Sequence, residues 1–383
     1  MILGSFDRRI MNDFHVRSGA IIALRLFDIA YSIDLKRIED LNTERRKGVT
    51  VRSSLLSAPV KSLAFDVPPV LLTLPSLRIT IGGRSMECPL TVRFYEFGVV
   101  SISLRFPAND IPWSGLSEFA NEVDRNVGPR GSHLPWQGIL EDLRETFLPA
   151  LQRPNATLFE EDHLVTVVQE WEKPMTSSEL QESLDLVPLL SGETRPLAAK
   201  AREELLRHRF SYYEDDLVVM TWDRAFIYEP RNDSDVADIL EVANAQLLEF
   251  RYYDELLDDE LPRMYEMVRR ARRPLNLLAS RRFADLARRL YTLVAEVTEL
   301  TEKAENVLRV TEDVYLARVY LAALGIFRVP TISASVQGKL AIIRDTYAAL
   351  YEEASSSRGE LLEFAIILLI VIEIGIALIR HAT

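Results

Sequence analysis

The sequence predicts an α+β protein in which an N-terminal mixed α/β domain precedes a long helical coiled-coil hairpin and one C-terminal transmembrane helix. Three observations predict this order. Strand patterns and turn residues mix with helical patterns up to residue 230, two apolar series with heptad spacing occupy 286–354, and a strongly apolar run occupies 361–379. The predicted units are therefore a domain at 1–230, a stalk at 235–357 and a span at 361–379.

The predicted strands of the first domain are short β-rich or alternating segments at 20–29, 77–81, 91–94, 99–106, 164–171, 210–213, 217–221 and 224–228. The predicted helices carry apolar residues at helical spacing at 34–41, 114–125, 137–151 and 196–208. Gly82 and Gly83 predict a hairpin turn, and Pro196 is expected at the first position of its helix.

Residues 229–235 are rich in turn and capping residues and predict a linker, after which almost every segment is helical. Apolar residues from Ile239 to Val268 recur at helical spacing and predict one long amphipathic helix. We expect Pro262 to kink this helix.

Two heptad seams predict the coiled coil. They consist of Leu286, Leu290, Leu293, Val297, Leu300, Ala304 and Val307, and of Val336, Leu340, Ile343, Tyr347, Leu350 and Ala354. The segment Gly325 to Ser333 breaks the pattern and predicts an antiparallel hairpin with Leu300 opposite Leu350. The alternative is a set of ordinary core helices, whose spacing would drift from this register within about three heptads.

The C-terminal run predicts a transmembrane helix that begins at Leu361, contains Phe364, Leu369 and Glu373, and ends at Ile379. At about 1.5 Å per residue, the run spans roughly 28 Å, close to the bilayer hydrocarbon thickness of about 30 Å. Its Leu, Ile, Val and Phe side chains from 364 onward favour insertion by roughly 4 to 7 kcal/mol, whereas Glu373 costs roughly 2.5 to 3.5 kcal/mol. A buried core helix is the alternative.

Residues 1–17 contain no apolar stretch of the length that a secretory signal needs. We therefore expect a single-pass anchor with the N-terminal bulk in the cytoplasm, at a bacterial inner membrane. Glu373 either contacts another span, where Gly375 and Ala377 permit close approach, or extends toward the membrane interface.

The composition excludes several classes of protein and site. The 383 residues carry a net charge of −12 and are 48% hydrophobic, which excludes a disordered or low-complexity chain. The single cysteine, Cys88, excludes an intrachain disulfide and a cysteine-cluster metal site, and we expect a structural thiol. The five histidines are scattered, and Asp258-Asp259-Glu260 forms either a divalent-ion site or, as we favour, a solvated helix face. The sequence predicts no catalytic residue, cofactor or metal.

An arginine run is the main polar feature. We define a candidate basic patch by Arg269, Arg270, Arg272, Arg273, Arg281 and Arg282, followed by Arg288 and Arg289. Such a patch can bind RNA or anionic lipid headgroups. The alternative is intramolecular pairing, because Glu266 lies four residues before Arg270 and Asp285 lies four residues from both Arg281 and Arg289.

Several C-terminal segments carry a family resemblance. They are KLAIIRDTY at 339–347, RGELLEFAIILLIVIE at 358–373, and Leu247-Leu248-Glu249 with Arg251-Tyr252-Tyr253-Asp254. In these segments the chain resembles the required-for-meiotic-nuclear-division (sporulation-type) family, membrane-anchored proteins that carry a domain of unknown function. Phe97-Gly98-Val99-Val100 is similar to the family's Gly-Val-Val strand, whereas Ser101-Ile102-Ser103 departs from it. The resemblance implies a non-enzymatic membrane protein, with eukaryotic members linked to mitochondrial translation.

Together these observations predict a non-enzymatic scaffold or tether at the cytoplasmic face of a membrane, with a protein partner or self-association. Two alternatives remain. The first is an oligomeric ion-transport protein. CorA-type magnesium channels have a second span and a Gly-Met-Asn loop, which this sequence does not contain, so such a protein would have to conduct ions with one span per chain. An enzyme would need a cluster of perturbed carboxylates or histidines in a pocket of the α+β domain.

Overall fold

The computed structural model describes residues 14–45, 49–52, 63–129, 131, 134–193, 195–231, 235–271, 279–310, 314–349 and 351–352. These residues form two compact units. The first contains the chain up to Glu249 together with Lys303–Pro330, and the second contains Phe250–Glu302 and the chain from Thr331 onward. The predicted order of a mixed α/β N-terminal domain followed by helices is confirmed.

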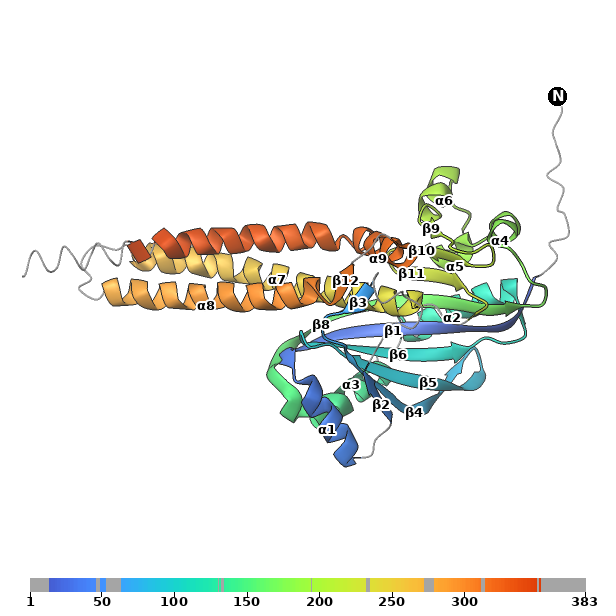
Figure 1. The fold of residues 1–383 in the computed structure, drawn as a ribbon, viewed down its shortest axis with the longest axis horizontal. Helices are drawn as coiled ribbons and strands as arrows, with labels where there is room; N and C mark the ends of the chain where they lie inside the picture. Colours follow the sequence, from blue (N-terminus) through green and yellow to red (C-terminus); the bar gives the residue numbers. More distant parts are fainter. Residues whose placement is uncertain are drawn as a thin grey trace, which may run out of the picture. The chain divides into compact units, whose positions relative to one another are not determined.

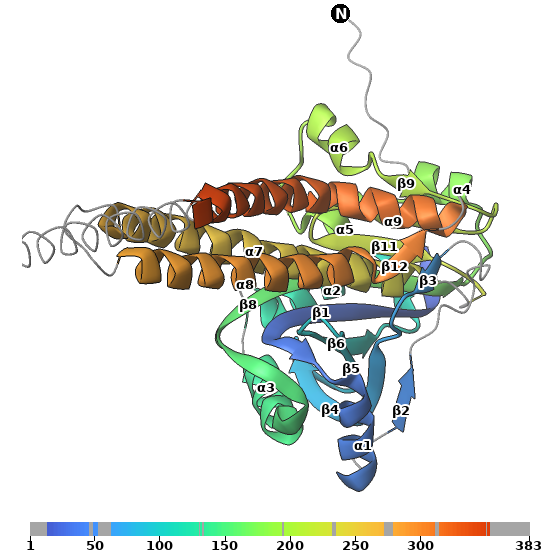
Figure 2. The ribbon, with the colours of Figure 1, turned by 60° about the vertical axis from the view of Figure 1, so that its left-hand side comes forward.

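A ten-stranded sheet forms the centre of the first unit, with the order β2-β4-β5-β6-β1-β8-β11-β10-β9 and with β7 added to β1 (Figures 1 and 2). Its strands are β1 (His15–Ile33), β2 (Val49–Arg52), β4 (Val70–Ile81), β5 (Arg84–Phe94), β6 (Val99–Pro107), β7 (Ile111–Pro112), β8 (Leu151–Trp171), β9 (Arg209–Phe210), β10 (Leu217–Met220) and β11 (Arg224–Tyr228). Neighbouring strands are antiparallel except β8 and β11, which are parallel. A separate antiparallel pair joins β3 (Leu63–Phe65) to β12 (Leu308–Val310).

The long strands β1 and β8 pair from Val16 opposite Trp171 to Ile33 opposite Leu151. Apart from Arg25 and Asp28, the middle of β1 is apolar on both faces, and every residue from Ala23 to Ala30 is buried. Such a strand requires cover on both faces of its sheet. Between β4 and β5, Gly82 and Gly83 both have positive φ, the backbone that a two-residue hairpin turn requires, so the predicted turn is confirmed.

Helices and an aromatic core cover one face of the sheet. The helices that follow in this unit are α1 (Leu35–Arg45), α2 (Trp113–Val127), α3 (Leu134–Phe147), the short 3₁₀ helix η1 (Leu148–Ala150), α4 (Ser177–Ser183), α5 (Val187–Ser191) and α6 (Ala199–Leu205). Trp113 of α2 lies 5.9 Å from the ring of Trp171 and 5.7 Å from that of Phe226. Phe147 of α3 lies 5.2 Å from Phe94 on β5. These contacts hold α2 and α3 on the sheet.

The opposite face carries the first turns of α7 (Val236–Ala271). At the end of β5 and just after it, Arg93 and Tyr95 alternate with the core residues Val92 and Phe94, and Arg93 contacts Glu241 of α7. Residues 241–250 of α7 are all buried, as expected for a helix segment that is covered on every side. The end of α8 (Ala279–Glu305) and α9 (Tyr315–Ile326) supply further cover. Gln246 donates to the carbonyl of Ala304 at 2.5 Å and accepts from the Tyr320 hydroxyl at 2.6 Å.

The second unit contains three helical segments, from α7, α8 and the helix Val329–Ala349 (Figure 1). Lys339 pairs with Asp254 and Asp258 of α7, each at 2.7 Å, and Tyr347 lies 5.8 Å from Tyr291 of α8. The buried apolar residues include much of both predicted seams: Leu286, Leu290, Val297, Leu300, Val336, Leu340 and Ile343. The bundle therefore includes α7 in addition to the two predicted arms.

The connection between the seams differs from the prediction. It includes β12 and α9, and the helix resumes at Val329, so the segment Gly325 to Ser333 is not a single break. Tyr347 lies beside Tyr291 rather than near Leu300, so the expected register of the two arms is wrong. The cause is the longer connection, whose α9 packs in the first unit through Tyr320.

Two local predictions are also corrected. The helix expected at 196–208 is α6, which begins after the extended Ala198, so Pro196 lies outside it. The strand expected at 210–213 ends at Phe210, because Asp216 accepts the backbone N–H groups of Tyr212 and Tyr213 at 2.7 and 3.1 Å. Pro262 lies inside α7, which continues on both sides of it, and the kink expected there stays a prediction.

Within the described ranges, no single helix is both long and apolar enough to cross a bilayer. The helices Tyr315–Ile326 and Val329–Ala349 meet that criterion only together, as a bent pair. The predicted span at 361–379 lies outside the described residues.

We predict that Gly98→Ala destabilises the first unit. Gly98 has φ of +98°, and a Cβ there would lie 1.9 Å from the carbonyl oxygen of Ala30. Backbone strain and this overlap should lower the free energy of unfolding by at least about 2 kcal/mol. Gly138→Ala is the matched control, because Gly138 lies inside α3 with open space at the Cβ position and alanine favours helix by up to about 1 kcal/mol. Urea unfolding of both variants checks this, and equal stabilities would contradict the packing at Gly98.

Candidate functional site

The arginine run lies on the helices of the second unit. Arg269 is exposed near the end of α7 and pairs with Glu266 at 2.7 Å, three residues away. The pairing of Glu266 with Arg270 stays a prediction, because the side chain of Arg270 lies outside the described part of the structure. Arg270, Arg281 and Arg282 lie on α7 and α8, while Arg272 and Arg273 lie outside the described residues. Arg288 and Arg289 are exposed on α8. The described arginines of the run therefore lie near the end of α7 and in the first half of α8, on either side of the connection between these two helices.

The predicted membrane residues Leu361, Phe364, Leu369, Glu373 and Ile379 lie outside the described residues. Among the acidic candidates, Asp258 pairs with Lys339 at 2.7 Å and Glu260 pairs with Arg263 at 2.5 Å. No group of three or more metal-binding side chains occurs in the part of the chain that the structure describes. Cys88 is buried, and burial raises the pKa of its thiol to about 11, which disfavours the reactive thiolate.

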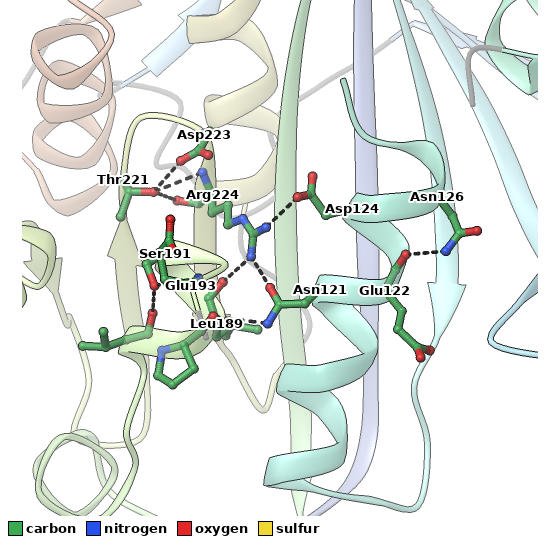
Figure 3. A network of polar contacts seen from close by, with 12 residues as sticks. Asn121, Glu122, Asp124, Asn126, Leu189, Ser191, Glu193, Thr221, Asp223 and Arg224 are labelled. Carbon is green, nitrogen blue, oxygen red and sulfur yellow. Dashed lines mark hydrogen bonds and ion pairs between the residues drawn. The ribbon is translucent and has the colours of Figure 1, made fainter. Parts of the chain in front are cut away.

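A polar network centred on Arg224 lies between α2, α5 and β11 (Figure 3). The buried guanidinium donates to Asn121 at 2.6 Å, to Asp124 at 2.7 Å and to the carbonyl of Leu189 at 2.8 Å. Thr221 accepts from the backbone N–H of Arg224 at 3.1 Å and donates to its carbonyl at 2.9 Å. Since the guanidinium donates hydrogen bonds to residues of both helices, it holds α2 and α5 against β11.

A second network on the same sheet surrounds Arg25, whose side chain is 2% exposed. It pairs with Glu160 at 3.2 Å and with Asp162, the residue opposite it on β8, at 3.9 Å. Burial raises the pKa of Asp162 to about 6; Arg25 opposes this rise, while the negative charges of Asp124 and Asp223 add to it. The charges of the two networks therefore influence each other.

The third network joins the sheet to α7. Arg93 donates to Glu241 at 2.6 Å and pairs with Asp238 at 2.9 Å, and the Tyr95 hydroxyl donates to Glu241 at 3.4 Å. Burial alone would lower the pKa of Arg93, but the negative charges of Glu241 and Asp238 raise it well above its ordinary value. Arg93 is therefore charged at every working pH and pairs with an acidic helix face.

Two buried titratable groups lie on β1 and β8. Asp28 accepts from the amide of Asn155 at 2.7 Å, and burial raises its pKa to about 8, so its carboxyl is protonated at neutral pH. His163 lies against Phe327 at 5.5 Å, and burial lowers its pKa to about 3, so its imidazole is neutral. Both side chains are 1% exposed, which suits interior structural groups.

Sequence reasoning missed these interior networks, although a signal was present. Arg25 and Asp28 interrupt the apolar segment ALRLFDIA, and Arg93 follows Thr91 and Val92 inside a strand. A charge in a buried strand requires a partner, because an unpaired buried charge is costly. The sequence does not reveal that the partners lie 148 residues away, as for Arg93 and Glu241.

We predict that Arg93→Met destabilises the fold by about 3 to 5 kcal/mol, because it leaves the buried Glu241 carboxylate without its cation. Arg93→Met combined with Glu241→Gln should recover part of this loss. The control is Arg78→Met, which breaks an exposed ion pair with Glu87 and should cost less than about 1 kcal/mol. A double-mutant cycle by urea unfolding measures the coupling, and additive losses would exclude it.

We also predict that stability falls as the pH rises from 6.5 to 8. In this window folded Asp28 holds its proton while the unfolded carboxyl is ionised, so unfolding releases a proton and each pH unit costs up to about 1.4 kcal/mol. His163 acts below pH 6.5 and in the opposite direction. Asp162, whose pKa is raised to about 6, is half protonated at that pH and adds to the fall mainly in the lower part of the window. Asp28→Asn should lack this slope, and parallel stability curves for the two proteins would refute the assignment.

Comparisons with known proteins concern the first unit. The family model described as the N-terminal domain of the uncharacterized protein MJ0711 matches residues 18–235. The uncharacterized protein MJ0711 of Methanocaldococcus jannaschii is 27% identical over 243 residues, which cover 63% of this chain and 73% of that protein. No solved structure matches the chain. Since the family model covers more than half of the sequence, this chain belongs to the family that carries the MJ0711 N-terminal domain.

Proposed function

We propose that this protein is a non-enzymatic, single-pass membrane-anchored scaffold or tether, which displays its α/β unit at the cytoplasmic face of a membrane. The observation that carries the proposal is the run at 361–379, which has the length and composition of a transmembrane helix. The helices of the second unit precede this run in the chain and would form the stalk.

The interior of the α/β unit supports a non-enzymatic role. The buried arginines Arg25, Arg93 and Arg224 each pair with carboxylates of the same unit. Such pairs position secondary structure, and removing one partner is costly. The perturbed groups Asp28 and His163 are likewise interior rather than surface side chains.

The helical segments support a stalk. The ring contact of Tyr291 with Tyr347 joins the helices that carry the two heptad seams within one chain, and Lys339 joins the second of these helices to α7. A coiled-coil hairpin reinforced by α7 is therefore our proposal for residues 250–302 and 331–352. The resemblance of 358–373 to the required-for-meiotic-nuclear-division family adds support for a membrane anchor after this stalk.

An aromatic surface on the first unit supports a protein partner. Tyr212, Tyr213 and Trp222 are 58%, 48% and 45% exposed. Tyr212 lies 4.7 Å from Tyr213 and 5.4 Å from Tyr315, so the tyrosines form one cluster. Exposed aromatic clusters are typical of binding surfaces, where tyrosine and tryptophan often contribute most of the affinity.

The experiment that tests the anchor is carbonate extraction of membranes from cells expressing the full chain. The wild type should remain in the membrane pellet, and a chain ending at Ser357 should be soluble. Leu369→Arg should also move the protein to the supernatant, because a second charge beside Glu373 adds roughly 2.5 to 3.5 kcal/mol to the insertion cost. Leu369→Ala is the matched control and should stay in the pellet. Identical partitioning of the wild type and the truncated chain would reject the anchor.

A further inference from the structure

Within the second unit, α7 and the helix Val329–Ala349 run parallel in a defined register. Asp254 bonds to Ser335 and Lys339, and Asp258, one turn later, pairs again with Lys339. The offset between the two helices is therefore 81 to 85 residues, from 335 − 254 and 339 − 254. α8 begins eight residues after α7 ends, and such a short connection makes the two helices antiparallel neighbours.

This register brings three exposed tyrosines to one level of the bundle. Tyr265 lies eleven residues after Asp254, which corresponds to positions 346–350 of the last helix. Tyr291 of α8 contacts Tyr347, which in turn lies 6.1 Å from Tyr351. Tyr265, Tyr291 and Tyr351 are 57%, 60% and 63% exposed. Three large aromatic side chains thus face solvent around one end of the bundle.

Exposed arginines lie just beyond the tyrosines. Arg269 is one turn past Tyr265 on α7, and its side chain is 76% exposed. Arg288 and Arg289 precede Tyr291 on the antiparallel α8, so they also lie toward this end, and both are exposed. We call Tyr265, Tyr291, Tyr351, Arg269, Arg288 and Arg289 the tyrosine–arginine belt.

The belt lies at the end of the bundle that leads to the apolar run. Leu361 follows Tyr351 by ten residues in the sequence. A shallow, open depression on the surface of α7 lies in the same region and is lined by Asp258, Leu261, Pro262, Tyr265, Glu266 and Arg269. The depression combines apolar and aromatic groups with an arginine, the combination that the boundary between headgroups and acyl chains favours. Its two carboxylates are paired with cations, Asp258 with Lys339 and Glu266 with Arg269.

We propose that the tyrosine–arginine belt binds anionic phospholipid headgroups at the cytoplasmic surface of the membrane. Tyrosine is enriched at membrane interfaces, and each arginine near an anionic leaflet contributes about 1 kcal/mol of attraction. The contact orients the stalk on the membrane and is favoured by the cytoplasmic leaflet, which is negatively charged. The proposal rests on the membrane anchor proposed above. RNA is the rival ligand, and the same experiment separates the two.

The test uses the full chain in neutral detergent, titrated with phosphatidylglycerol or phosphatidylcholine and read out as bound lipid by native mass spectrometry. The wild type should bind phosphatidylglycerol more tightly, and Arg269→Gln, Arg288→Gln and Arg289→Gln together should weaken this binding roughly 10- to 100-fold. Raising the salt from 0.1 to 0.5 M should weaken it as well. Arg195→Gln, Arg207→Gln and Arg209→Gln together are the matched control, with the same charge change on exposed residues of the first unit, and should leave it unchanged.

Equal binding of the two lipids by the wild type, or unchanged phosphatidylglycerol binding by the belt variant, overturns the proposal. A belt variant that loses binding to a 30-nucleotide single-stranded RNA while it keeps phosphatidylglycerol binding also overturns it and assigns the arginines to RNA. Carbonate extraction of the belt variant distinguishes the two proposals. Retention in the pellet leaves the anchor intact when the belt fails, whereas release of the wild type rejects the anchor independently of lipid selectivity.

Discussion

The pairing of β1 with β8 places an apolar strand at the centre of the sheet, and both faces of that strand are buried. A strand that is apolar on both faces is not stable with helices on one face of the sheet alone. The chain must therefore supply a second layer that covers the other face. The first layer is α2 and α3, which come from the segment between β7 and β8. The second layer is the start of α7 with the end of α8 and α9, which all follow residue 235 in the chain. The first unit therefore requires residues 303–330 to complete its core.

The interior charges follow from the same constraint. When a helix covers a sheet, a charged strand residue is enclosed and needs a partner from the covering layer. Arg224 donates hydrogen bonds to Asp124 and Asn121 of α2. Arg93 forms ion pairs with Glu241 and Asp238 of α7. Each pair fixes one layer at one position on the sheet, whereas apolar contacts alone would tolerate small shifts. The two faces are thus positioned by separate arginines.

Sequence reasoning predicted elements whose signal is local. The turn at Gly82-Gly83, the helix α1 and the strand Arg224–Tyr228 were recognisable because glycine pairs, helical spacing and β-rich runs act over a few residues. The full length of β1 and β8, the addition of α7 to the bundle and the cover that α9 supplies depend on contacts between residues far apart in the chain. The register of the heptad seams was predicted incorrectly, because spacing defines which side of a helix is apolar but not which level of the partner it meets. The arginine run was visible in sequence, whereas its alignment with the exposed tyrosines required the ion pairs of Lys339.

The burial of Cys88 has a practical consequence. Its side chain lies in the buried apolar core of the first unit, and the thiolate that reacts with electrophiles is disfavoured at neutral pH. A maleimide added to the native protein therefore reacts only when the sheet opens. The rate of labelling then measures how often this opening occurs. The same protection allows a cysteine introduced on the surface to be labelled selectively while the natural residue stays in place. The sequence thus contains its own internal reporter of unfolding.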